Sequence, residues 1–87
     1  MSKDERKIPF LNLTTVQINE WAMAFCPEFD VSACGPDRNV VTSDLFDMVK
    51  RNASILLQEE STSPTLRKWS KEVVDHQDCI EDLFKIA

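Results

Sequence analysis

Glycine is scarce in this chain, with one glycine beside four prolines in 87 residues. β-Hairpins depend on turn positions with positive φ, and glycine is the residue that fills such positions most readily. A turn-rich all-β domain would therefore need more glycines than this chain has. Because 43% of the residues are hydrophobic, the chain is apolar enough to fold. We predict an all-α domain, a small bundle of three main helices.

The last third of the chain carries the longest helical spacing. Alternating steps of three and four residues reach six apolar side chains and the only histidine, namely Leu66, Trp69, Val73, His76, Ile80, Leu83 and Ala87. Ser63 and Pro64 are typical of a helix start, with the serine as N-cap. We predict a helix over residues 64–86. Its charges oppose the helix dipole, so the alternative is a break near residues 75–78.

Two more helices are predicted from apolar residues that share a face. A helix over about residues 15–25 would end before Pro27 and carry Ile18, Trp21, Ala22 and Phe25 on one side, with Trp21 and Phe25 in the core. A second helix, over about residues 43–59 and capped by Thr42 or Ser43, would align Phe46, Val49, Ala53 and Leu56. Residues 27–42 contain a Gly-Pro-Asp turn signal and are predicted to be an ordered loop.

The chain is expected to form one domain. Residues 1–9 are predicted to be a flexible N-terminal arm and residues 10–87 a single helical domain. No run of about 18 apolar residues is present, and the N-terminus lacks the apolar core of a secretory signal, so we expect neither a membrane segment nor export. Three cysteines, an odd number, favour a reducing compartment. An intracellular location, cytoplasmic or nuclear, is expected.

The sequence gives weak support for a metal site or for a nucleophilic catalytic site. A zinc site is conceivable from Cys26, Cys34, His76 and Cys79, but seven residues separate the first two cysteines and a zinc knuckle has two to four. A Cys-His nucleophilic pair would lack a glycine-rich or helix-start oxyanion site. We expect no catalytic residue, no metal and no cofactor. His76 is predicted to lie at the edge of the core, bonded to a backbone carbonyl or a nearby acid.

The net charge of the chain limits the classes of partner that it is expected to bind. A net charge of −5 and a pI near 4.7 argue against direct binding to nucleic acid, which requires clustered Lys and Arg. The end of the chain combines a widened apolar face with an acidic rim, and the predicted partner-binding residues are Asp75, Asp78, Glu81, Asp82, Phe84 and Ile86. The expected function is a non-enzymatic protein-interaction module, a small acidic adaptor, regulatory or inhibitory subunit that binds a larger protein with a basic or apolar groove.

Alternative functions stay open at this point. One is an inhibitor that mimics nucleic acid and occupies a nucleic-acid-binding protein, because the chain is acidic. Another is a small domain stabilised by zinc. Homodimerisation stays open as well.

Overall fold

The computed structural model describes residues 9–86, which form a four-stranded mixed sheet and two α-helices. The elements, in chain order, are β1 (Leu11–Ile18), β2 (Trp21–Cys26), β3 (Val31–Gly35), α1 (Arg38–Gln58), α2 (Pro64–Asp75), the 3-10 helix η1 (Gln77–Leu83) and β4 (Phe84–Ile86). The strand order is β3-β2-β1-β4, with β4 parallel to β1 and the other pairs antiparallel. The predicted all-α helical bundle is therefore wrong, and the fold class is α/β.

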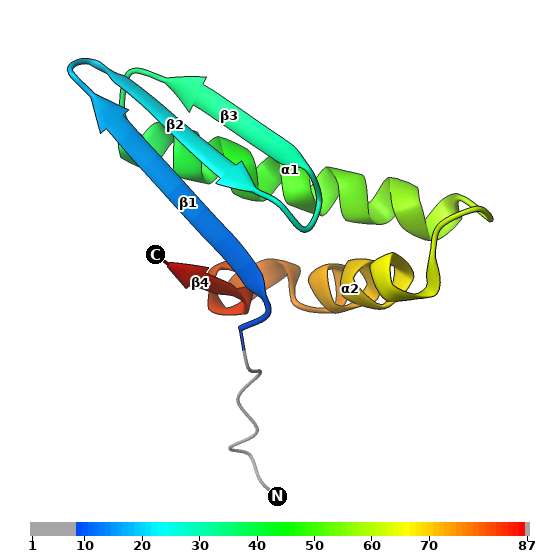
Figure 1. Ribbon diagram of the computed structural model, residues 1–87. Helices are drawn as coiled ribbons and strands as arrows, with labels where there is room; N and C mark the ends of the chain where they lie inside the picture. Colours follow the sequence, from blue (N-terminus) through cyan, green and yellow to red (C-terminus); the bar gives the residue numbers. More distant parts are fainter. Residues whose placement is uncertain (1–8, 87) are drawn as a thin grey trace, which may run out of the picture.

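The two helices lie on the same side of the sheet. α1 crosses behind β1, β2 and β3, and α2 packs against α1 (Figure 1). Fully buried side chains fill the space between these layers, and the largest are Leu11, Leu45, Leu83, Val41, Val49, Val73 and Cys26. No described element covers the opposite face of β1–β3. Of the predicted N-terminal arm, residues 1–8 lie outside the described residues.

The β1–β2 hairpin replaces the helix predicted over residues 15–25. Asn19 and Glu20 alone connect the two strands, and Asn19 has a φ of 54°. Asp30, between β2 and β3, has the same φ. Asparagine and aspartate tolerate this left-handed region better than other non-glycine residues, because their short polar side chains bond locally. The scarcity of glycine therefore did not exclude hairpins.

Strand β2 is apolar on both faces, which is why its residues resembled part of a helix. Ala22, Ala24 and Cys26 point inward and are fully buried. The residues between them, Trp21, Met23 and Phe25, point outward and are exposed. A half-buried strand is recognised by alternating apolar and polar residues, and that alternation is missing here. The placement of Trp21 and Phe25 in a helical core is therefore wrong.

Helix α1 begins at Arg38, earlier than predicted, and ends at Gln58, one residue before the predicted end. Its N-cap is Asp37, whose Oδ1 accepts a hydrogen bond of 2.7 Å from the Asn39 N–H. The predicted 27–42 loop therefore contains β3, a turn at Pro36 and the first turn of α1. The Gly-Pro-Asp signal marks a strand end, a turn and a helix cap in succession.

The predicted 64–86 helix is also wrong as one helix, while the alternative of a break is confirmed. α2 starts as predicted, with the Ser63 hydroxyl accepting from the Leu66 N–H at 3.2 Å and Pro64 in the first turn. It ends at Asp75, and the chain continues as η1 and β4. The Cα register pairs Phe84 with Leu11, so the end of the chain becomes a strand because β1 supplies the partner.

Arginine and threonine side chains fix the junction of the two helices. The Arg67 guanidinium donates from Nη1 to the Leu57 carbonyl at 3.1 Å and from Nη2 to the Glu59 carbonyl at 2.6 Å. The Thr62 hydroxyl donates to the Leu56 carbonyl at 2.7 Å. The Leu56 and Glu59 carbonyls also accept backbone N–H groups, so the side-chain bonds reinforce the end of α1, and those from Arg67 hold α2 against it.

The carboxylate of Glu28 forms hydrogen bonds with β1 beyond the last residue pair of β1 and β2. The last register pair is Thr14 with Phe25. Beyond it, Asn12 donates its N–H to Glu28 Oε1 at 2.9 Å and its Nδ2 to Glu28 Oε2 at 2.6 Å. Partial burial acts to raise the pKa of Glu28, but the bonds from Asn12 outweigh it, so this pKa lies below its ordinary value of 4.5.

The lowered pKa predicts a loss of stability in acid. A carboxyl with a lower pKa in the folded state stabilises that state above the unfolded pKa, and the contribution disappears as pH falls through the folded pKa. We expect the wild-type chain to lose more free energy of unfolding than Glu28→Gln between about pH 6 and pH 3. Urea unfolding at both pH values measures the difference. Asp30→Asn, which keeps a residue suited to positive φ, is the matched control, and equal losses in wild type and Glu28→Gln would contradict the prediction.

Candidate functional site

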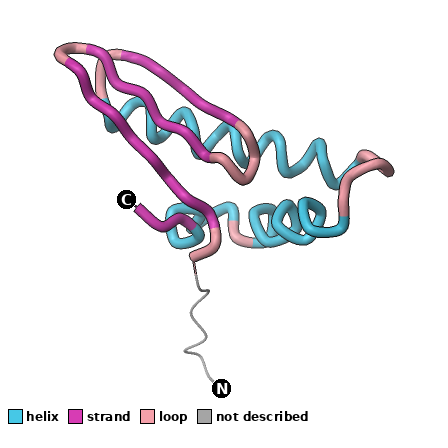
Figure 2. The backbone as a smooth tube through the Cα atoms, viewed as in Figure 1, coloured by secondary structure: helices cyan, strands magenta, loops and turns pink. Residues whose placement is uncertain are grey.

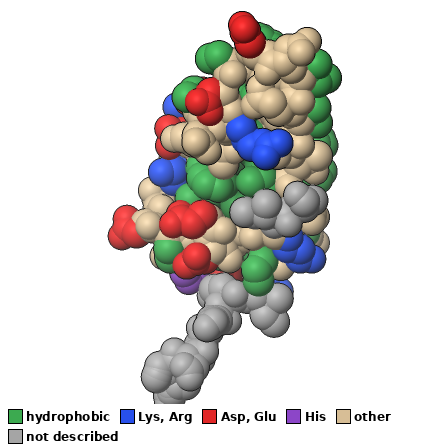
Figure 3. Space-filling view, turned by 90° about the vertical axis from the view of Figure 1, so that its left-hand side faces the viewer, with side chains coloured by type: hydrophobic (Ala, Val, Ile, Leu, Met, Phe, Trp, Pro, Cys, Tyr) green, Lys and Arg blue, Asp and Glu red, His purple; other side chains and the backbone are tan. Residues whose placement is uncertain are grey.

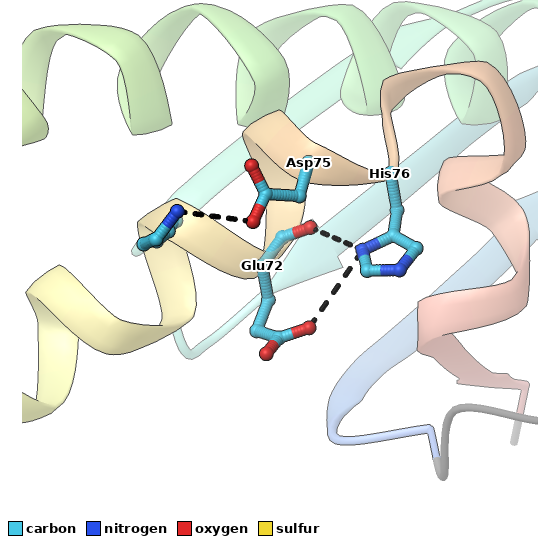
Figure 4. Close-up of polar contacts among 4 residues, drawn as sticks. Glu72, Asp75 and His76 are labelled. Carbon is cyan, nitrogen blue, oxygen red and sulfur yellow. Dashed lines mark hydrogen bonds and ion pairs between the residues drawn. The ribbon is translucent and has the colours of Figure 1, made fainter. Parts of the chain in front are cut away.

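The predicted C-terminal contact residues separate into an exposed and a buried group. The acids Asp75, Asp78, Glu81 and Asp82 are all exposed, at the end of α2 and on η1. Asp75 forms an ion pair with Lys71 at 3.2 Å (Figure 4). Phe84 is 5% exposed, and its ring lies 5.0 Å from that of Phe46, centroid to centroid. Phe84 is therefore a core residue rather than a partner contact. Ile86 lies in β4, and its side chain is outside the described part.

His76 closes the end of α2, as the interpretation of a core-edge histidine predicted. Its half-buried ring places Nδ1 2.9 Å from the Glu72 carbonyl oxygen and 3.7 Å from Glu72 Oε1 (Figure 4). Its backbone N–H donates to the Glu72 and Val73 carbonyls. The ring thus adds a second hydrogen bond to the Glu72 carbonyl at the helix end.

The structure does not bring the candidate zinc ligands together. Cys26 points from β2 into the core, whereas Cys34 is exposed on the opposite face of the sheet. Within residues 9–86, no group of three or more His, Cys, Asp and Glu side chains could hold a metal ion. All three cysteines are free thiols, and burial raises the pKa of Cys26 to about 11, which keeps it protonated and unreactive.

The uncovered side of the sheet carries a continuous row of exposed apolar side chains. We call this surface the outer sheet face, and its apolar residues are Val16 (46% exposed), Ile18 (60%), Trp21 (54%), Met23 (43%) and Phe25 (39%). The β1–β2 register sets Ile18 beside Trp21 and Val16 beside Met23, so the side chains form cross-strand pairs. The face looks toward the reader in Figure 1 and appears edge-on along the right-hand side of Figure 3.

Charge is absent from the outward positions of β1, β2 and β3, but it is present around them, since Lys85 of β4 is exposed in register with Asn12 on the same side of the sheet. The other outward positions of β1, β2 and β3 are polar or weakly polar and uncharged, namely Asn12, Thr14, Ser32 and Cys34. Glu20 lies in the turn at one end of the β1–β2 hairpin, and Glu28 and Asp30 lie in the turn at the other end. The surface therefore has an apolar centre and acidic ends, within a chain of which 29% is charged.

The fold explains why this face stays open. A sheet has two faces, and the single helix α1 covers only one of them with its buried stripe of Val41, Leu45, Val49 and Ala53. α2 packs on α1 and so adds nothing to the other face. An exposed apolar patch of this kind is unusual on a monomer and is typical of an interaction site.

Sequence reasoning missed the outer sheet face. A usable signal exists, because apolar residues at positions 16 and 18 and at 21, 23 and 25 recur with the period of two that a strand shows. The interruption falls at Asn19 and Glu20, where a two-residue turn reverses the chain. The signal was obscured by Ala22, Ala24 and Cys26, which make the other face of β2 apolar as well.

No protein-family model, curated protein or solved structure matches this chain. The class is therefore defined by the fold and the site, a two-layer α/β domain with one uncovered sheet face whose centre is apolar. Among the described helices, none combines the length and the apolar character that crossing a bilayer requires.

Proposed function

We propose that this domain is a non-enzymatic protein-interaction module, a small acidic adaptor, regulatory or inhibitory subunit that binds a larger protein through its outer sheet face. The observation that carries the proposal is the row of five large apolar side chains, each 39–60% exposed, on two strands whose outward positions carry no charge. Leaving this much apolar surface in water is unfavourable, and a partner that covers it recovers roughly 25 cal/mol for each Å² buried.

The chemistry of the face indicates the chemistry of the partner. Its centre requires an apolar surface, and the acidic ends at Glu20, Glu28 and Asp30 favour basic residues on both sides of that surface. A second copy of this chain fits less well, because two chains of net charge −5 repel each other. We therefore propose a partner with an apolar, basic-rimmed groove.

Trp21 is the expected centre of the contact. Tryptophan is the residue most enriched among positions that dominate binding energies, because a large rigid ring buries much area at a small loss of conformational entropy. Trp21 lies next to Ile18 across the hairpin and is more than half exposed. Met23 and Phe25 extend the same strand and would surround it.

Trp21→Ala is expected to weaken binding of the partner at least about 30-fold, since the loss of a central aromatic contact is worth roughly 2 kcal/mol or more. Its free energy of unfolding should change by less than about 1 kcal/mol, because the side chain is exposed. The measurement is affinity capture of the partner from the native lysate with the tagged full chain, followed by titration calorimetry of the identified complex and by urea unfolding of the free variant.

Two charge-removing variants serve as the matched control. Asp78→Asn and Asp82→Asn change exposed side chains of η1, which is not part of the β1–β2 hairpin. Each should alter the affinity less than about 3-fold. The reverse result, full binding by Trp21→Ala and strong loss with both η1 variants, would refute the outer sheet face as the contact.

The second candidate is mimicry of nucleic acid. It is favoured by the exposure of all four predicted acids, Asp75, Asp78, Glu81 and Asp82. Binding of this kind would weaken steeply with salt, whereas binding dominated by the apolar centre of the outer sheet face would weaken much less. The salt dependence of the affinity in the same titrations separates the two.

An intracellular, reducing location is part of our proposal, and the three free thiols support it.

A further inference from the structure

Strand β4 covers only the beginning of β1. The register joins Leu11 to Phe84 and Leu13 to Ile86, while β1 continues to Ile18 (Figure 2). From residue 14 onward, no described strand lies on the side of β1 opposite β2. We call residues 14–18 on this side the open edge of β1.

Backbone groups of two residues face the open edge. Because a two-residue turn connects β1 and β2, the closing pair Ile18 and Trp21 exchanges both of its backbone hydrogen bonds. The alternation along an antiparallel ladder then directs Val16 toward β2 and turns the N–H and C=O of Thr15 and Gln17 outward. Within residues 9–86 these outward groups have no backbone partner, so an added strand could bind all of them.

A pocket adjoins the open edge. It has a volume of about 410 Å³ and lies between β1 and the first half of α1, with Leu13 and Thr15 on the strand and Arg38, Thr42, Ser43 and Phe46 on the helix. Leu13 and Thr15 belong to the inward set of β1, so the inward side chains of an added strand would lie over this pocket. Figure 3 looks onto this side of the molecule, where hydrophobic side chains are visible in a hollow beside a basic one.

The pocket has the opposite charge to the chain as a whole. Arg38 is its single charged lining residue, and it forms no ion pair with a described residue. Arg38 is also the first residue of α1, and the one carboxylate at this helix end, that of the N-cap Asp37, accepts the Asn39 N–H and does not line the pocket. In a chain of net charge −5, this is a place where an anionic side chain is attracted.

We propose that the open edge of β1 binds an extended segment of another protein by strand addition, with an acidic side chain of that segment in the pocket against Arg38. The outward side chains of the segment would lie beside Val16 and Ile18, so they would be apolar. The expected motif alternates inward residues, one of them acidic, with outward apolar residues. This site is separate from the outer sheet face, and its existence does not depend on the function proposed for that face.

A second copy of the chain fits the open edge poorly. The inward residues of its own β1 are Leu13, Thr15 and Gln17, none of which is acidic, so a copied strand has no carboxylate for Arg38. The occupant that the chemistry selects is therefore an acidic segment of a different protein.

The test is selection of displayed random heptapeptides on the folded full chain, followed by titration of the enriched synthetic peptides into the ¹⁵N-labelled chain. We expect enriched peptides that alternate acidic and apolar residues, and chemical-shift changes with slowed hydrogen exchange at the Thr15 and Gln17 amides. Arg51→Gln is the matched control, because Arg51 is an exposed residue of α1 outside the pocket lining, and it should leave these effects unchanged. Arg38→Gln should weaken binding at least about 5-fold. Thr15→Pro removes an outward N–H while leaving the ladder with β2 in place, so it should abolish binding.

Several outcomes would overturn the proposal. One is a selection that enriches no motif, and another is a peptide affinity that Arg38→Gln leaves unchanged. A third is that the chemical-shift changes occur at Trp21 and Phe25 instead of the open edge. The fourth is a dimer in sedimentation experiments whose Thr15 and Gln17 amides are protected from exchange without peptide. Arg38→Gln carries the test even where Thr15→Pro fails to fold, because the Arg38 side chain is exposed and holds no structural contact.

Discussion

Replacement of Phe84 by alanine is expected to lower the free energy of unfolding by about 3–5 kcal/mol, the usual loss when a buried phenylalanine is truncated. Phe84 is 5% exposed and stacks at a tilt against Phe46 with ring centroids 5.0 Å apart. It also begins β4, a strand of three residues, and pairs with Leu11. A domain of this size has a total stability of roughly 5–10 kcal/mol, so the variant would be close to unfolding.

Urea unfolding followed by circular dichroism measures this loss. Phe25→Ala is the matched control, because it makes the same chemical change at a position 39% exposed on the outer sheet face. We expect it to cost less than about 1 kcal/mol. Partner affinity should show the opposite order, with Phe25→Ala weakening the complex and the folded fraction of Phe84→Ala binding normally. A small stability loss in Phe84→Ala would show that the end of the chain is not part of the core.

Leu45→Ala is expected to lower the free energy of unfolding by about 3 kcal/mol. Leu45 is fully buried in the middle of α1, on the stripe that faces the sheet. Removing its side chain leaves a cavity between the two layers, and the surrounding strands and helices are too constrained to fill it. The size of the loss measures how much of the stability comes from packing α1 on the sheet.

The control for this prediction lies on the same helix. Ile55 is 51% exposed, and Ile55→Ala replaces a β-branched residue by the best helix former, so its free energy of unfolding should stay within about 0.5 kcal/mol of wild type. Thermal unfolding monitored at the helical signal compares the two variants. Equal losses at Leu45 and Ile55 would contradict the orientation of α1 described above.

Sequence reasoning succeeded where local signals are sufficient. The start of α2 depends on Ser63 and Pro64, whose cap and fixed φ act within one helical turn, and that start was predicted. The position of α1 was predicted apart from its first turn, because its buried Val49 and Ala53 repeat with the helical period. The order of charges along residues 64–86 opposes the dipole of one long helix, which is why a break near residues 75–78 was the alternative prediction. The structure has this break, because α2 ends at Asp75.

The candidate sites were not predictable in the same way. The outer sheet face exists because α1 lies on one side of the hairpin and α2 packs on α1, and neither fact is encoded in the spacing of Val16, Ile18 or Trp21. The open edge of β1 depends on where β4 stops, which a register between the two ends of the chain decides. The four exposed acids were predicted to be surface residues, and they are. Phe84 was predicted to contact a partner together with them, but it is buried in the core.

By itself, the sequence determined the start and cap of α2, most of the length of α1 and the acidic character of the chain, since these depend on local residue patterns or on composition. Only the tertiary structure decided that residues 11–26 form a hairpin rather than a helix and that Phe84 is buried against Phe46. The physical reason is that strands obtain their hydrogen bonds and burial from distant parts of the chain. An apolar segment such as β2, with both faces hydrophobic, becomes a strand or a helix according to the partners it meets.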